Sequence, residues 1–398
     1  MAAGKASYFE MTYVGPWKGT DVSMPETMID PASTPYAENW IPRSGELRTR
    51  PQRRVFLPGL PDNSIITGQC PFADANNVVH SCVTSTSGLW QLNSQWRNYP
   101  GKTWSNVGFY LHNDIPAPNT PVQFQVFVNS LFYVDGSTNL WFWNGVTPNS
   151  ISSQPALQSV AQYDTTNLLN AGGYFLGELN SYIIILNTVE QVQPVAGPTL
   201  PKYPSNFPQR LRWSAPGLPF TWDPTVNTGA GYIDELDVPD TITGFMAIGS
   251  NGFIFRVNGI SELTSISGGV LPWDINHLWA SQRGIGSVYP WSIANYGPIG
   301  IFIATDDVYE LSLGGFKKIG GRSRNAIFHD IGMAVSAPTA SIFPAWSATY
   351  PYVTYMLEIV LAGGIVHDWL YFVEDDCWML WPYSNGYFTG KVMLMPTI

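Results

Sequence analysis

The sequence has few charged residues. Only 12% of its 398 residues are Asp, Glu, Lys or Arg, about half the usual share in a soluble protein. Much of the surface must therefore be neutral and polar, or covered by partners. The formal net charge is −10 at pH 7, which disfavours wrapping of nucleic acid by the surface as a whole. Hydrophobic residues make up 45% and aromatic residues 14%, more than a disordered chain contains.

The sequence also lacks a long apolar segment and has few cysteines. Its longest apolar region, residues 352–366, is short for a membrane span and contains Glu358. The N-terminal residues lack the apolar core of a secretory leader, so we expect a soluble protein with no membrane anchor. The cysteines lack metal-site spacing and are expected to be reduced packing residues, although Cys70 and Cys82 could face each other across a hairpin. The cysteines are Cys70, Cys82 and Cys377.

Recognised catalytic motifs are missing. The sequence contains no H-E-x-x-H, G-x-S-x-G, P-loop, G-x-G-x-x-G or acidic calcium loop. We therefore predict a protein that is not an enzyme, with no catalytic residue, no metal and no cofactor. An orphan hydrolase is the weakest of the functional hypotheses.

The histidines are scattered along the chain and are interpreted as structural. Two of them precede an aspartate, in His329-Asp330 and His367-Asp368. Neighbours along a strand point to opposite faces of a sheet, so neither pair is expected to form a proton relay. The full set is His80, His112, His277, His329 and His367.

The sequence is instead rich in short apolar segments with the two-residue period of β-strands. Residues 124–145, FQVFVNSLFYVDGSTNLWFWNG, alternate Phe, Val, Tyr and Trp with polar residues, and turns are expected at Asn129-Ser130 and Asp135-Gly136. Branched and aromatic residues favour a half-buried pleated surface, and these turn residues accept the positive φ of tight hairpins. The pattern predicts a three-stranded meander that needs neighbours to cover its apolar face.

Similar segments recur at intervals of roughly 50 residues. The dipeptide Asn-Ser occurs at positions 129–130 and 180–181, and Leu-Trp occurs at 89–90 and 140–141. Because propeller blades span about 40–50 residues, this period predicts an all-β, β-propeller-like body of about six or seven blades.

The blades do not extend over the whole chain. Residues 1–58 contain regularly spaced prolines and little alternation, so we expect an extended N-terminal arm at 1–58 and a propeller body at 59–398. Residues 387–398 are expected to close the ring against an early blade. Phe253 and Val308 are placed at equivalent points of two blades. No helix longer than a turn or two is expected, because Pro and Gly are spread throughout.

Charged residues gather in a few short stretches. Arg pairs with carboxylates in a directional, bidentate manner, so the basic stretches are candidate docking sites, with solvated loops as the alternative. The acidic stretches are expected to line a lumen or meet a partner, and head-to-tail pairing of the two kinds of patch between copies would generate a ring. The basic candidates are Arg43, Arg48, Arg50, Arg53, Arg54, Lys317, Lys318, Arg322 and Arg324. The acidic candidates are Asp234, Glu235, Asp237, Asp240, Glu374, Asp375 and Asp376.

Tryptophan offers an alternative function, because exposed indole rings stack on sugars. A propeller with such a surface would bind glycans, for example in recognition of a host receptor. Aromatic residues on blades are more often part of the core, since each buries a large apolar area, and the core role is favoured here. The candidates are Trp90, Trp96, Trp141, Trp143, Trp222 and Trp378.

Four segments, taken in order, resemble one family of proteins. Residues 35–51 have an A-x-N pattern followed by a glycine turn and R-P, and residues 210–224 contain W-S-x-x-G-x-P-x-x-W. Residues 240–263 read as a strand pair, and residues 284–311 contain P-x-S-I followed by F and D-D-x-Y. Together they are similar to tailed-bacteriophage virion proteins of the tail-nozzle and head-completion (DNA-stabilisation) type.

The resemblance covers about half of the chain and departs from the family pattern at two positions. Gln52 follows Pro51 where the family has glycine, and Asp307 stands where glycine is common. The resemblance implies a propeller in a sixfold ring of the tail, below the portal and adaptor, with fibres or other tail proteins outside. Phage DNA would pass through without specific binding, and the protein would be made in the host cytoplasm and reside in the virion.

Overall fold

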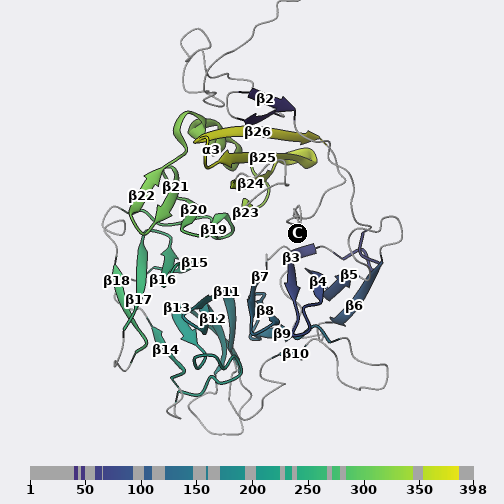
Figure 1. Ribbon diagram of the computed structural model, residues 1–398, viewed down its shortest axis with the longest axis vertical. Coiled ribbons are helices and arrows are strands. Elements are labelled where there is room, and N and C mark those ends of the chain that lie inside the picture. Colours follow the sequence, from purple (N-terminus) through teal and green to yellow (C-terminus); the bar gives the residue numbers. More distant parts are fainter. Residues whose placement is uncertain are drawn as a thin grey trace, which may run out of the picture.

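The computed structural model is an all-β propeller of six four-stranded blades arranged around an axis (Figure 1). It describes residues 40–43, 46–49, 59–64, 66–92, 103–109, 122–146, 158–159, 171–192, 203–224, 229–234, 240–266, 271–277, 284–343 and 353–384. The predicted fold class is confirmed, and the blade number is the lower of the two expected values.

Each blade is an antiparallel meander of four consecutive strands, with the first strand nearest the axis and the fourth at the rim (Figure 1). Blade 1 comprises β3 (Ile66–Ala73), β4 (Val79–Ser85), β5 (Gly88–Leu92) and β6 (Trp104–Phe109). Blade 2 comprises β7 (Gln123–Phe127), β8 (Ser130–Val134), β9 (Trp141–Trp143) and β10 (Gln158–Ser159). Blade 3 comprises β11 (Ala171–Leu179), β12 (Tyr182–Val192), β13 (Tyr203–Trp213) and β14 (Gly231–Asp234).

The second half of the ring repeats this order. Blade 4 comprises β15 (Ile242–Ile248), β16 (Asn251–Arg256), β17 (Ile260–Ser265) and β18 (Trp273–His277). Blade 5 comprises β19 (Ala294–Tyr296), β20 (Ile299–Ile303), β21 (Val308–Ser312) and β22 (Gly315–Lys318). Blade 6 comprises β23 (Thr339–Phe343), β24 (Thr354–Val360), β25 (Ile365–Phe372) and β26 (Cys377–Ser384).

The meander predicted at residues 124–145 is β7, β8 and β9. The first turn is centred one residue earlier than expected, because the positive φ angles belong to Val128 (46°) and Asn129 (55°) and Ser130 already begins β8. The second turn contains Gly136 at φ 81°. The side chains of Leu131 and Phe132 are fully buried, so neighbouring blades cover both faces of this sheet.

The repeat assignments hold for one strand position and fail for another. Leu89-Trp90 and Leu140-Trp141 both lie at the third strand of a blade, as the spacing predicts. Phe253, however, is in the second strand of blade 4, whereas Val308 begins the third strand of blade 5. Their placement at equivalent points is wrong, because connections of different length separate the strands and no fixed period aligns them.

Apolar side chains pack between neighbouring blades. Residues of blades 1 and 2, including Phe72, Cys82 and Trp143, form one cluster. Residues of blades 3 and 4, including Trp213 and Phe245, form another. Because each sheet contributes apolar residues from both faces, the core is a series of layers around the ring rather than one central mass.

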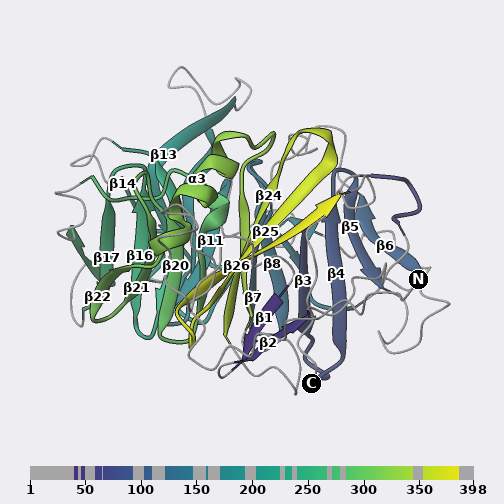
Figure 2. The same ribbon diagram turned by 90° about the horizontal axis from the view of Figure 1, so that it is seen from above.

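The propeller has two unlike faces. Turns that join the first to the second and the third to the fourth strand of a blade lie on one face, which we call the apolar face for its exposed side chains. Turns between the second and third strands, and the connections between blades, lie on the other. Figure 2 shows the β3–β4 turn on the first face and the β24–β25 connection on the second. We call the second the helix face, because the chain between blades 5 and 6 forms α3 there.

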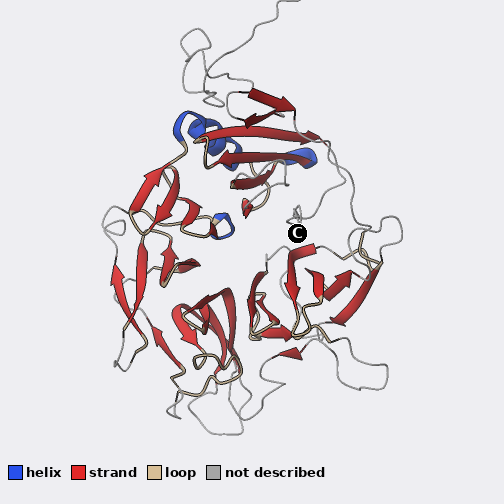
Figure 3. Ribbon diagram, in the orientation of Figure 1, coloured by secondary structure: helices blue, strands red, loops and turns tan. Residues whose placement is uncertain are grey.

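Helix α3 (Arg324–Gly332) spans nine residues between blades 5 and 6 and is longer than the sequence analysis expected (Figure 3). Ile327 and Ile331, one turn apart, pack into the cluster between these blades. A helix of this length is not stable in isolation, so this burial stabilises it. The described residues also contain three short 3-10 segments: η2 (Pro290–Ser292), η3 (Gly321–Ser323) and η4 (Ala362–Gly364). No helix among the described residues is long and apolar enough to cross a membrane.

The described part of the N-terminal arm is a hairpin rather than an extended segment. Strands β1 (Trp40–Arg43) and β2 (Glu46–Thr49) pair with each other and lie beside β26, the outer strand of blade 6 (Figure 1). The expected closing strand at residues 387–398 lies outside the described residues. Among the described strands, every sheet of the ring is built from consecutive strands, and none combines both ends of the chain.

Candidate functional site

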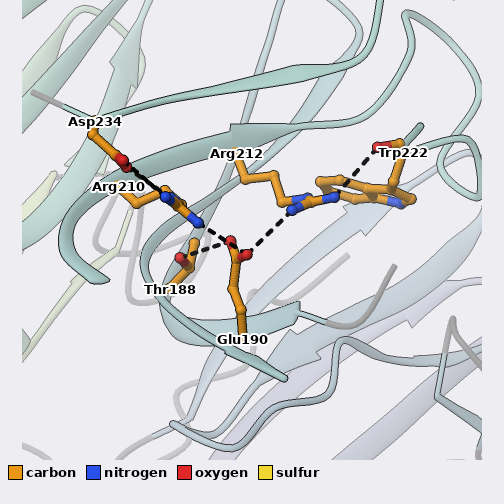
Figure 4. A network of polar contacts seen from close by, with 6 residues as sticks. All are labelled: Thr188, Glu190, Arg210, Arg212, Trp222 and Asp234. Carbon is orange, nitrogen blue, oxygen red and sulfur yellow. Dashed lines mark hydrogen bonds and ion pairs between the residues drawn. The ribbon is translucent and has the colours of Figure 1, made fainter. Parts of the chain in front are cut away.

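The outer half of blade 3 holds a network of polar contacts that joins three strands (Figure 4). Strands β12 and β13 are eleven residues each and pair with an irregularity between Leu186 and Thr188. Arg210 and Arg212 are two residues apart on β13, so both side chains lie on the same face of the sheet. Asp234 on β14 is the cross-strand partner of Arg210.

Two arginines converge on the carboxylates in this network. The Nε and Nη2 atoms of Arg210 donate to the two carboxylate oxygens of Asp234 at 2.6 and 2.8 Å. Its Nη1 donates to Oε2 of Glu190 at 3.0 Å, and Nη1 of Arg212 donates to the same oxygen at 3.4 Å. Thr188 donates to the other oxygen of Glu190 at 3.1 Å. Three strands are thereby linked through side chains.

Aromatic rings hold the guanidinium of Arg210 in place. Its Cζ atom lies 3.8 Å from the ring centroid of Phe207 and 4.6 Å from that of Tyr232. Hydrogen bonds from Arg210 hold the pKa of Asp234 below its usual range. Since Asp234 is engaged in this bidentate pair, the network fastens the rim strand β14 to its blade, and Asp234 is not available to a partner in this arrangement.

Three of the basic candidates, Lys317, Lys318 and Arg324, form contacts within the chain. Lys317 on β22 lies 3.2 Å from Oδ2 of Asp376, in the β25–β26 turn. Lys318 lies 2.7 Å from Oδ2 of Asp306, and Nε of Arg324 donates to the carbonyl oxygen of Asp306. One predicted basic residue thus pairs with one predicted acidic residue in the same molecule. Both side chains of the Lys317–Asp376 pair are more than half exposed, so its contribution to stability is small.

The remaining described candidates lie in different elements, and five candidates lie outside the described residues. Arg43 ends β1 and Arg48 lies on β2; Asp240 accepts a hydrogen bond from the backbone of Asn258 at 2.6 Å. Glu374 accepts one from the backbone of Val353 at 3.1 Å, and Arg322 belongs to η3. Burial raises the pKa of Asp375, with the adjacent charge of Glu374 as a second cause. The candidates outside the described residues are Arg50, Arg53, Arg54, Glu235 and Asp237.

The tryptophans proposed for sugar stacking are core residues where they are described. None of the described five is more than 5% exposed. The indole of Trp141 donates to Oδ2 of Asp135 at 3.0 Å, and that of Trp222 donates to the carbonyl oxygen of Pro219 at 2.7 Å. These rings are covered and cannot stack on a glycan in this structure. The buried residues are Trp90, Trp141, Trp143, Trp222 and Trp378; Trp96 lies outside the described residues.

The aspartate of one His-Asp pair makes a contact that the sequence analysis missed. His329 and Asp330 lie on α3 rather than on a strand, and Asp330 accepts hydrogen bonds from Nδ1 of His367 at 2.7 Å and from the indole of Trp369 at 2.8 Å. Burial would raise the pKa of Asp330, but these two donors outweigh it and hold the pKa below its usual range. The contact fastens α3 to β25. The spacing of Ile327 and Ile331 was the one signal for this helix.

The apolar face carries exposed apolar side chains from several blades. Val128 is 63% exposed and Leu313 is 61% exposed, each at the tip of a hairpin. The described turns on this face contain no Lys or Arg. Other exposed residues in or beside these turns are Val78, Val79, Val146, Leu218, Ile266 and Tyr296. This surface was not predicted, because the sequence alone does not show which apolar residues of a β-rich chain stay exposed.

Val128 is unusual in conformation as well as exposure. Its φ of 46° lies in the left-handed region, which β-branched residues rarely adopt. The equivalent turn of blade 3 has Asn180 and Ser181 at φ 51° and 69°, residue types that tolerate this region better. The turn of blade 2 therefore keeps an exposed valine at a conformational cost.

Comparisons with known proteins add little beyond the fold. No family model matches the chain, and no curated protein matches it either. Among solved structures, it is similar to a mutant of AofleA from Arthrobotrys oligospora, with 12% identity, a TM-score of 0.37 and coverage of 81% of this chain and 87% of that one.

Two further solved structures are similar over most of the chain. One is the AfRom2 CNH domain, with 9% identity, a TM-score of 0.40 and coverage of 79% of this chain and 94% of that one. The other is the SapL1 lectin in complex with alpha methyl fucoside, with 12% identity, a TM-score of 0.37 and coverage of 80% and 96%. Likeness at this level concerns the propeller fold alone and carries no argument about function.

No group of three or more His, Cys, Asp or Glu side chains among the described residues could hold a metal ion.

Proposed function

We propose that this chain is a non-enzymatic structural protein of a tailed bacteriophage, repeated around a ring of the tail below the portal and adaptor. In this role it is a nozzle or hub whose ring encloses the passage for DNA. The observation that carries the proposal is the apolar face, where exposed apolar turn residues recur from blade to blade. A repeated apolar surface without basic residues suits a permanent contact with another protein of the assembly.

The residues behind the family resemblance have structural roles that fit a scaffold. Ser214 continues the β12–β13 pairing one residue beyond Trp213. Its backbone N–H donates to the carbonyl of Ile183 at 3.0 Å, and its Oγ accepts from the N–H of Ile183 at 3.1 Å. The indole of Trp213 donates to the carbonyl of Gly229 at 3.0 Å. Gly217 has φ 70° and donates to the carbonyl of Ser181 at 2.8 Å. This motif shapes the described part of the loop, residues 214–224, on the apolar face.

The strained turn at Val128 favours a contact role for this face. An Asn or Gly at this position would relieve the left-handed conformation, and an exposed valine contributes nothing to the core of the monomer. Strain that folding does not require is commonly found at binding surfaces. We assign the apolar face to the adjoining ring protein of the tail, and the rim with its charged residues to neighbouring copies of this chain.

Imaging tests the proposed assembly. Purified full-length protein, alone and mixed with the adaptor of the same phage, is examined by light scattering and cryo-electron microscopy. A closed ring with an axial passage, seated on the adaptor by the apolar face, is expected. A monomer that does not bind the adaptor but binds sugars on a glycan array would overturn the proposal in favour of receptor recognition.

Matched substitutions on the two faces test the assigned surface. The double variant Val128→Asp with Leu313→Asp is expected to weaken seating on the adaptor, because two carboxylates would be buried in an apolar contact. The control variant carries Met333→Asp and Val335→Asp on the helix face, where the side chains are equally exposed at 61% and 62%. Equal loss in both variants, or loss in the control alone, would contradict the assignment.

A third variant tests the arm. Replacement of Arg48, Arg50, Arg53 and Arg54 by Ala is expected to impair ring assembly and leave the monomer folded, as measured by light scattering and circular dichroism. Unchanged assembly would argue against docking through the arm.

A further inference from the structure

Two cysteines lie opposite each other in blade 1. Cys70 on β3 and Cys82 on β4 are direct register partners in an antiparallel pair, so their side chains lie on the same face of the sheet. Both are free thiols. This confirms the expectation that they could face each other across a hairpin.

The hydrogen-bonding pattern of the hairpin gives the type of pair. Asp74 donates through its backbone N–H to the carbonyl of Val78 at 3.0 Å, next to the turn. Hydrogen-bonded and non-hydrogen-bonded pairs alternate along an antiparallel ladder. Counting back from Asp74, Pro71 falls at a non-hydrogen-bonded position, as its missing N–H requires. Cys70 and Cys82 are then a hydrogen-bonded pair, with Cα atoms about 5.5 Å apart.

That separation is suited to a disulfide. Bridged cysteines have Cα atoms about 4.4–6.8 Å apart, most often about 5.5–6 Å, and Cβ atoms about 3.5–4.5 Å apart. Directly opposite residues have Cβ atoms about 4.5–5.5 Å apart, and hydrogen-bonded pairs lie toward the upper end of that range, so the bond needs an approach of about 1–2 Å. Strand β3 is the inner edge of its sheet and pairs only with β4, so it can make this approach without disrupting a second strand pairing.

The surroundings favour a bond between these two sulfurs alone. The Cys82 side chain belongs to the apolar cluster between blades 1 and 2, and Cys70 packs against that cluster. Cys82 is fully buried and Cys70 is partly exposed. The third cysteine, Cys377, begins β26 in blade 6 and is buried there. A small oxidant therefore reaches Cys70 first.

We propose that Cys70 and Cys82 are a disulfide-forming pair that low-molecular-weight disulfides, such as oxidised glutathione, convert to an intrachain cross-link. The thiolate of Cys70 attacks one sulfur of the oxidant, which gives a mixed disulfide and releases one thiol. The thiolate of Cys82 then attacks the Cys70 sulfur, forms the protein disulfide and releases the second thiol. The protein loses two electrons and two protons, and the oxidant gains them as two thiols.

The cross-link would fasten the innermost strand of blade 1 to its blade. This is the blade that follows the N-terminal arm and faces blade 6 across the end of the ring (Figure 1). The inference is independent of the proposed function, because it concerns the chemistry of the hairpin only.

Exchange in the folded protein is expected to be slow. Burial raises the pKa of the Cys70 thiol to about 12 and that of the Cys82 thiol well above its usual value, and only the thiolate is the nucleophile. The test must therefore reach equilibrium rather than compare rates. It uses long incubation at mildly alkaline pH, started separately from reduced and from oxidised protein.

The experiment measures how strongly the fold favours the bond. Full-length Cys377→Ser protein is equilibrated in glutathione buffers of varied redox ratio, with and without denaturing urea. Free thiols are then trapped by alkylation and mapped by mass spectrometry. We expect the glutathione ratio needed to reduce the Cys70–Cys82 bond to be about 100-fold more reducing for the folded than for the unfolded chain, since a disulfide compatible with the fold stabilises it.

Two results would overturn the proposal. One is a folded protein that stays alkylated at both cysteines under every oxidising buffer, from both starting states. The other is a bond no harder to reduce in the folded than in the unfolded chain, which would mean that β3 resists the approach. If Cys377→Ser fails to fold, the wild-type protein is mapped in the same way instead. The variant Cys70→Ser, which cannot form the intrachain bond, is the control for cross-links between molecules.

Discussion

The two faces of the propeller use their side chains differently. On the helix face, two buried carboxylates accept hydrogen bonds from tryptophan. Asp135 accepts from the indole of Trp141, and Asp330 on α3 accepts from the indole of Trp369 on β25. On the apolar face, the hairpin tips carry Val128 and Leu313 with most of their surface exposed. Changes at Asp135 and Asp330 should therefore affect folding, and changes at Val128 and Leu313 should affect assembly. The following predictions test this separation.

The largest loss of stability is expected for a substitution in the interior. It serves as the reference for the smaller effects on the two faces. Replacement of Trp141 by Ala removes a buried ring that stacks on Tyr133 at a centroid distance of 6.4 Å and donates to Asp135. We expect a loss of about 3–5 kcal/mol in the free energy of unfolding, because the cavity cannot collapse fully. Urea denaturation measures it. A loss below 1 kcal/mol would mean that the ring is not part of the core.

The pH dependence of stability tests the helix face next. Burial raises the pKa of Asp135 to about 6, although hydrogen bonds from Ser137 and Trp141 oppose the shift. The folded state then holds this proton more tightly than the unfolded state does, so stability should fall as pH rises from about 4 to 6, by up to about 3 kcal/mol. Asp135→Asn should flatten this dependence. An equal pH profile in the variant would contradict the assignment to Asp135.

The third prediction concerns the tie between α3 and β25. Asp330→Ala leaves the indole of Trp369 and the ring nitrogen of His367 without their carboxylate acceptor, and we expect a loss of about 2 kcal/mol. The depressed pKa of Asp330 contributes stability that is present above about pH 4 and lost as pH falls through the folded value. Acid unfolding of the variant should therefore lack this component. Ring assembly should be unchanged at neutral pH, as light scattering would check.

The smallest effect on stability, with the opposite sign, is expected on the apolar face. Val128→Asn should stabilise the monomer by about 1 kcal/mol, since Asn tolerates the positive φ that valine does not. The same change should weaken seating on the neighbouring tail protein. A variant that is more stable and assembles equally well would show that the strained turn has no role in assembly. That result would contradict the difference drawn between the two faces.

The sequence carried enough local information for the blades and their turns. Period-two apolar residues with Asn, Asp and Gly at the breaks located β7 to β9, because these signals depend only on neighbours along the chain. The burial of the five described tryptophans was also favoured correctly, since a large aromatic ring gains most from burial. The phage assignment and the partners remain predictions.

Contacts between distant segments were beyond the same reasoning. Asp330 meets His367 only because α3 folds back on blade 6, and Lys317 meets Asp376 only because blades 5 and 6 adjoin. Neither pair has a signature in the local sequence. The error at Phe253 and Val308 has a related cause, because connections of unequal length shift the strands relative to any fixed period.

The sequential order of strands within each described sheet has a consequence for biosynthesis. Every ladder can form as soon as its own segment leaves the ribosome, so hydrogen bonding in one blade need not await the last residues of the chain. Such short-range topology favours rapid folding, and it allows the blades to form in the order of translation, from blade 1 to blade 6.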